Sequence, residues 1–176
     1  IERKKMLKDA LNFIRLQVQD IKHYDKYSIS SIILIYVLLE ALSYLTDGLA
    51  TVSLGEALGN LVMTMSAFLF FIYWIFRKVK KHSFTLACKF FGVMNIGLSI
   101  AIIILQIISV ALGFSLENMY IASASLLFII FITGITTSKA IDVSNSYALI
   151  GASLSFLLLI VFYSIYLMIE MMILNV

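Results

Sequence analysis

Residues 84–114 have the sequence FTLACKFFGVMNIGLSIAIIILQIISVALGF, in which Lys89 is the one charged side chain. About 20 apolar residues suffice for a helix to cross the hydrocarbon core of a bilayer. This run is longer, so it predicts a membrane-spanning helix that tilts or projects beyond the lipid. Lys81, Thr85 and Lys89 recur at steps of four around its start. We therefore expect its first two turns to project into the cytoplasmic interface.

Four more apolar runs resemble this one in composition. The chain of 176 residues is 62% hydrophobic and 13% charged, against about 45–50% and about 25% in soluble domains. Proline is absent, which favours uninterrupted helices. The sequence thus predicts an all-α, polytopic membrane protein with a five-helix transmembrane domain over residues 27–176. We place its spans at residues 28–45, 54–76, 84–114, 119–138 and 145–174.

The distribution of basic residues predicts the orientation. All 13 lysines and arginines lie before the first span, around the start of the third, or between the fourth and fifth. Cytoplasmic loops carry the excess of Lys and Arg in membrane proteins. Five spans with the N-terminus inside put every basic residue on the cytoplasmic side and the C-terminus outside. Five acidic residues then lie in the outer half, namely Glu40, Asp47, Glu56, Glu117 and Glu170.

The N-terminal segment, residues 1–26, is charged but periodic. Its apolar side chains recur at steps of four and three, which predicts one face of a cytoplasmic amphipathic helix; these are Leu7, Leu11, Ile14, Val18 and Ile21. Such an arm could lie on the membrane surface with its basic side chains toward anionic headgroups. It could equally pair with a partner helix, or pack on its own membrane domain.

The first apolar run follows 26 charged, periodic residues and lacks a small-residue cleavage site. We therefore expect no cleaved signal peptide, and expect this run to stay in the mature protein. The single cysteine, Cys88, excludes an internal disulfide. The simple charge asymmetry then favours the cytoplasmic membrane of a bacterium, with a eukaryotic organelle membrane as the alternative.

Glu40 is the most informative polar residue, because it lies about 12 residues into the first predicted span, in the outer half of the hydrocarbon. A carboxylate there normally faces a bundle interior, a partner or water. We expect it to be protonated, to accept hydrogen bonds from Asn60 or Gln106, or to meet a basic residue of a second protein. Asn60, Asn95 and Gln106 are the other strong polar groups in the spans, and bonding between helices is their leading explanation.

Small residues at a spacing of four predict close helix–helix contacts. Such pairs are Gly55 with Gly59, Gly97 with Ala101, Ala148 with Ala152, and Gly151 with Ser155. Packing within the bundle is the first interpretation, and contact with another chain is the second.

Catalytic motifs are missing from the sequence. A cysteine beside a histidine base could act as a nucleophile. His82 and Cys88 are six residues apart, however, which separates them by about 120° around a helix, so they do not share a face. No Asp-rich metal motif or phosphate-binding loop occurs, so we expect no metal and no cofactor. The basic stretch 77–82 lies at a span end, where it anchors topology, and we expect no nucleic-acid partner.

The leading hypothesis is a non-catalytic membrane subunit or accessory protein that acts through helix–helix contacts with a partner or as a homo-oligomer. Transport-complex components, assembly factors and immunity proteins against membrane-active toxins all belong to this class. A cation or proton conductor that uses Glu40 with Asn60 and Gln106 is the alternative, and an intramembrane enzyme is the third hypothesis.

Overall fold

The computed structural model describes residues 2–46, 66–75, 83–112 and 119–174. Helix α1 covers Glu2–Ile14, and a 3-10 helix, η1, follows at Ile21–Lys26. The longer helices are α2 (Ile29–Thr46), α4 (Phe84–Leu112), α5 (Met119–Ile141) and α6 (Asn145–Leu174), and Ser66–Ile75 is a further helical segment. Every regular element of the described ranges is helical, which confirms the all-α class.

Three of these helices are long and apolar enough to cross a membrane. They are Phe84–Ile108, Ala124–Ile141 and Asn145–Ile169, which lie largely within the third, fourth and fifth predicted spans. The described parts of the first two predicted spans contain shorter apolar helices, Ile29–Leu39 and Ser66–Ile75. Five spans remain a prediction.

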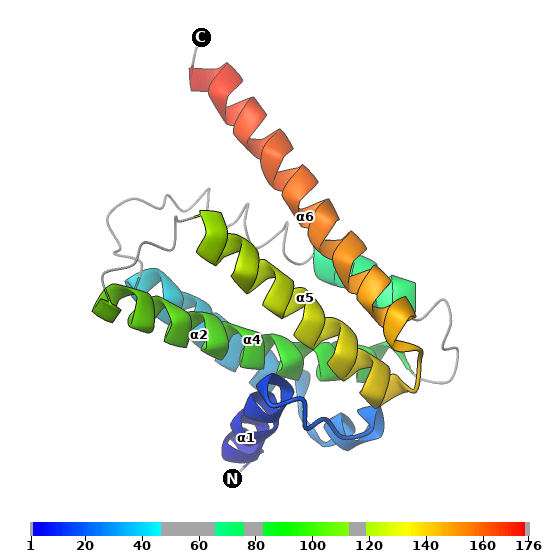
Figure 1. The fold of residues 1–176 in the computed structure, drawn as a ribbon. Coiled ribbons are helices and arrows are strands. Elements are labelled where there is room, and N and C mark those ends of the chain that lie inside the picture. The colour runs from blue at the N-terminus through cyan, green and yellow to red at the C-terminus, as the bar shows by residue number, and fades with distance from the viewer. Residues whose placement is uncertain (1, 47–65, 76–82, 113–118, 175–176) are drawn as a thin grey trace.

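Helix α4 organises the packing. It packs against α2, α1 and η1, whereas α5 pairs with α6. Figure 1 shows α1 below α4 at the N-terminal end of the chain, with α5 and α6 on the opposite side of α4. The buried core includes Met6, Phe13, Phe90 and Phe91. The rings of Phe13 and Phe90 lie 5.3 Å apart, so aromatic contacts join the N-terminal arm to α4.

The prediction that one helix extends through Lys26 is wrong. Helix α1 ends at Ile14, because Leu16 takes a left-handed backbone conformation with φ 57°. The amide of Leu16 donates to the carbonyl of Phe13, and the amide of Gln17 donates to the carbonyl of Asn12. These two hydrogen bonds are the Schellman arrangement that satisfies the last carbonyls of a helix. The chain then turns into η1, whose N-cap is Asp20.

The residues of the predicted apolar face of this arm also differ in burial, because some of them are buried and others are exposed. Met6, Ala10 and Phe13 are the fully buried side chains of α1, whereas Leu7 and Leu11 are each 37% exposed. Ile14 and Val18 pack partly buried against the core, and Ile21 is fully buried. The predicted face and the buried face of α1 have the same helical spacing, and the contact with α4 decides which face is buried.

The N-terminal end of α6 is fixed by a reciprocal contact with the segment Ser66–Ile75. The indole Nε1 of Trp74 donates to the carbonyl of Tyr147 at 3.3 Å, and the Tyr147 hydroxyl donates to the carbonyl of Trp74 at 2.7 Å. The two rings are stacked, with centroids 5.4 Å apart. Gly151 leaves room for this indole, since a Cβ there would lie 2.3 Å from Trp74 Cδ1.

Candidate functional site

The three polar residues predicted to act together are only partly described. Glu40 belongs to α2, but its side chain lies outside the described residues, as does the whole of Asn60. Gln106 is buried in α4 and has an interaction partner. An Asn60–Gln106–Glu40 site therefore stays a prediction.

The predicted small-residue contacts fall inside the chain where the structure describes them. Gly97 faces α1, and a Cβ at this position would lie 2.3 Å from the backbone carbonyl oxygen of Ala10. Ala148 and Ala152 are fully buried on α6, whereas Ala101 is partly buried on α4. Gly55 and Gly59 lie outside the described residues.

His82, one member of the pair considered for catalysis, also lies outside the described residues. Cys88 is partly buried in α4. Within the described ranges no three His, Cys, Asp or Glu side chains are grouped so that they could hold a metal ion. The polar side chains that the structure does bring together lie between α1 and η1.

Asp9 is the centre of a polar cluster that ties α1 to η1. Its Oδ2 accepts from the Tyr27 hydroxyl at 2.6 Å and from Lys26 Nζ at 3.1 Å, and lies 2.7 Å from His23 Nε2. His23 Nε2 is also 2.6 Å from Lys26 Nζ. One ring nitrogen can either donate to Asp9 or accept from Lys26, so the tautomer of His23 decides which bond forms.

Burial and hydrogen bonding shift the pKa values in this cluster in opposite directions. Burial alone raises the pKa of Asp9, but the hydrogen bonds from Tyr27, His23 and Lys26 outweigh it and hold that pKa below 3.8. Burial, with the Asp9 carboxylate beside it, raises the pKa of the Tyr27 hydroxyl. Burial likewise raises the pKa of Tyr24 to about 12. Asp9 is therefore an anion and both phenols are neutral at physiological pH.

Sequence reasoning missed this cluster, although its spacing was a usable signal. Counted from His23, Lys26 is three residues and Tyr27 four residues further along the chain. One helical turn therefore presents all three side chains toward a single acceptor. The partner, Asp9, lies 14 residues before His23. Only the turn at Leu16, which the sequence did not indicate, brings the two together.

In the N-terminal segment the acidic side chains bond within the chain, whereas most of the basic side chains are exposed without such bonds. The acids all bond within the chain: Asp9 as above, Asp25 with Lys89 Nζ at 2.8 Å, Glu2 with the amide of Ser28 and Asp20 with the amide of Lys22. The exposed basic residues that make no such bond in the described ranges are Arg3, Lys4, Lys5, Lys8, Arg15 and Lys22. The outward face of α1 is therefore positively charged around Leu7 and Leu11.

A long exposed apolar surface belongs to residues 157–172 of α6, the half toward the C-terminus, which is the outer half under the predicted orientation. Figure 1 shows this part of α6 extending away from the other helices. Its exposed side chains lie on most sides of the helix, apart from the face of Leu159, Phe162 and Tyr166, which is partly buried; they are Leu157, Ile160, Val161, Tyr163, Ile165, Leu167, Met168, Ile169, Met171 and Met172. Leu159 of this stretch lines a cavity with residues of α4 and α5, whereas the exposed side chains have no cover in the described chain, which makes them the candidate interaction surface.

No known protein family matches this chain, and neither curated proteins nor solved structures include a match. The functional argument therefore depends on the surfaces described above.

Proposed function

We propose that this chain is a non-catalytic integral membrane subunit or accessory protein that works through helix–helix contacts with a partner protein or with copies of itself. The outer half of α6 is the observation that carries this proposal. Membrane helices associate through close van der Waals packing and interhelical hydrogen bonds. The inner half of α6 has such contacts within the chain, whereas the outer half exposes apolar side chains over most of its circumference.

The position of α1 helps to locate the inner edge of the hydrocarbon, and with it the depth of the exposed α6 surface. Exposed lysines and arginines of α1 cannot lie in hydrocarbon, and α1 contacts α4 as far along as Gly97. Beyond its first residue, α4 exposes large apolar side chains only from Ile102 onward. The inner edge of the hydrocarbon therefore fits the level of Gly97, which leaves the first turns of α4 on the cytoplasmic side.

The same level on α6 is near Ser155, which lines one cavity with Asn95 and Leu98 of α4. From there a helix needs about 20 residues to cross the core, so the outer half of α6 lies within the hydrocarbon. At a rise of 1.5 Å per residue, Tyr163 then lies about 12 Å from Ser155 along the helix axis, and so about 12 Å from the inner edge of the hydrocarbon. It is 48% exposed, and no hydrogen bond within the described residues uses its hydroxyl. Lipid tails offer no acceptor, so this phenol favours a protein partner.

A photocrosslinking scan along residues 157–172 tests the proposal. We expect protein–protein products at positions that recur every three or four residues and include Tyr163, because a docked helix covers one face. The same probe at the exposed positions Ile104 of α4 and Leu127 of α5 is the comparison with other helices. Gentle purification should recover a stoichiometric partner or a homo-oligomer. Uniform products along α6, with a lone chain that moves ions in liposomes, would instead support the conductor.

The proposal includes five spans, a cytoplasmic N-terminus and an external C-terminus in a bacterial cytoplasmic membrane. A fluorescent protein fused before residue 1 should fluoresce in the cytoplasm, and an epitope after Val176 should be accessible from outside intact cells. Permeabilised cells control for epitope detection. An epitope that becomes accessible only after permeabilisation would contradict the odd number of spans.

A further inference from the structure

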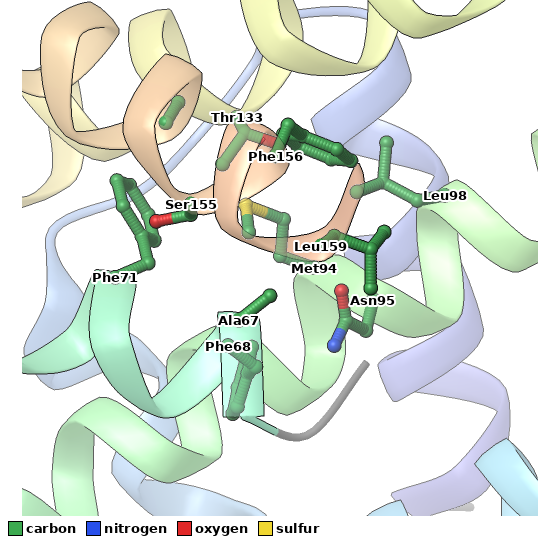
Figure 2. A pocket seen from close by; sticks show the side chains of 11 residues that line it. Ala67, Phe68, Phe71, Met94, Asn95, Leu98, Thr133, Ser155, Phe156 and Leu159 are labelled. Atoms are coloured by element: carbon green, nitrogen blue, oxygen red, sulfur yellow. The ribbon is translucent and has the colours of Figure 1, made fainter. Parts of the chain in front are cut away.

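A cavity of about 80 Å³ lies where Ser66–Ile75, α4, α5 and α6 meet. Figure 2 shows the lining side chains arranged around one gap, with Phe68, Phe71 and Phe156 on different sides of it. Aliphatic and thioether groups fill most of the remaining wall. Three polar side chains interrupt this apolar lining, namely Asn95, Thr133 and Ser155.

Thr133 is the unusual group among them. It is only 5% exposed, and its Oγ1 has no hydrogen-bond partner in the described part of the chain. A threonine inside a helix normally bonds back to the preceding turn. Thr136 on the same helix does so, donating to the carbonyl of Ile132 at 2.6 Å. A buried hydroxyl without a partner is costly, so a polar atom in the cavity would stabilise Thr133.

The other two polar groups can complete a binding site. No hydrogen bond within the described residues uses the Asn95 amide, which therefore has both donors and an acceptor available. Ser155 donates its proton to the carbonyl of Gly151 at 2.8 Å. Its oxygen can still accept. Hydroxyl and amide groups thus offer donors and acceptors without any charged side chain in the lining.

The size and lining of the cavity decide between water and a ligand. A buried water needs about 10–15 Å³ and two to four polar partners. The volume admits several waters, but the apolar walls would leave most of them short of partners. An apolar cavity of roughly 150 Å³ takes up benzene, so this one suits a ligand, or the end of a ligand, of about half that size. A mixed lining fits a molecule with both apolar and polar parts.

We propose that this cavity binds a small neutral amphiphile, whose hydroxyl or carbonyl group bonds to Thr133 and Asn95 while its hydrocarbon part lies against the three phenylalanine rings. The site is separate from the exposed surface of α6. It is a ligand site at the proposed inner edge of the hydrocarbon, in addition to the proposed contacts with a partner protein.

The test uses 1-propanol as the probe and the full chain in lipid nanodiscs, with methionine methyl groups labelled for NMR. Met94 lines the cavity, whereas Met168 and Met172 are exposed on the apolar surface of α6. We expect the Met94 signal to shift saturably at about millimolar propanol, the range for a ligand of four heavy atoms. The signals of Met168 and Met172 should move linearly, because they report only the alcohol dissolved in lipid.

Two matched variants test the role of the hydroxyl. Thr133→Val keeps the shape and removes the polar group, so propanol affinity should fall about three- to tenfold, the effect of one neutral hydrogen bond. Thr137→Val is the control, because Thr137 is also buried and unpartnered among the described residues but does not line the cavity. Its affinity should equal that of the wild type. An unresponsive Met94, a linear Met94 shift, or equal affinity in Thr133→Val would each overturn the proposal.

Discussion

Replacing Gly97 with leucine is expected to detach α1 from α4. A Cβ at Gly97 would lie 2.3 Å from the carbonyl oxygen of Ala10 and 3.1 Å from its carbonyl carbon. These are backbone atoms, so no side-chain rotation relieves the clash and α1 must move as a unit. Overpacking alone costs about 1–3 kcal/mol, and exposing Met6 and Phe13 adds to that. We expect docking of α1 to weaken by about 3 kcal/mol, or more than a hundredfold.

Thiol labelling measures this release. In a Cys88→Ser background, a cysteine introduced by Met6→Cys is buried while α1 is docked, and should react far faster in the Gly97→Leu variant. Alanine supplies the matched comparison on the same helix. Gly97→Ala meets the backbone of α1, whereas the Cβ of Gly92→Ala meets the Ile32 side chain of α2 at 2.5 Å and lies away from α1. Equal labelling of these two alanine variants would contradict the close approach of α1.

Removing the charge of Asp9 is expected to loosen the same arm from η1. Asp9→Asn keeps an acceptor for Tyr27 but loses the anion that also bonds to His23. Hydrogen bonds to charged groups contribute about 1.5–3 kcal/mol, while the half-exposed Lys26 adds little. We expect a loss of about 2 kcal/mol. Spin labels at the exposed positions Lys5 and Phe84 should give a narrow distance distribution in the wild type and a broad one in Asp9→Asn.

The pH dependence of that distance follows from the lowered pKa of Asp9. A carboxyl whose pKa is depressed by folding stabilises the folded state above its ordinary value of 3.8. This contribution is lost as the pH falls through the lower, folded value. The wild-type distribution should therefore broaden only below about pH 4, and Asp9→Asn should show no step there. Asp20→Asn is the control, because Asp20 only accepts from the exposed amide of Lys22. If Asp9→Asn kept the narrow wild-type distance distribution at neutral pH, Asp9 would not contribute to the docking of the arm.

The sequence predicted the long helices well, because hydrophobic run length is a local property. Helix α6 covers the predicted residues 145–174, and α4 starts at the predicted Phe84. Without proline, nothing in these runs competes with helix. The N-terminal arm was predicted less well. Its turn requires a left-handed residue, and leucine at position 16 gives no hint of one, since glycine usually occupies that position.

The buried face of α1 shows a second limit. Leu7, Leu11 and Ile14 have the same spacing as Met6, Ala10 and Phe13, so periodicity could not choose between them. The choice depends on α4, which is distant in the sequence. The cavity was hidden for a similar reason. Thr133 looks like any threonine of an apolar helix until the structure shows that its hydroxyl lacks the usual bond to the preceding turn.

The packing of α1 on Gly97 also sets an order of events during synthesis. Ala10 leaves the ribosome well before the residue it contacts, and at about 5–20 residues per second the delay is roughly 4–17 s. During this interval the nascent arm presents Met6 and Phe13 together with its lysines, as a free amphipathic peptide. It can close onto the bundle only after α4 has been inserted. The arm is made before α4 but finds its native contact only after α4, and a ribosome stalled before Gly97 would display the arm open.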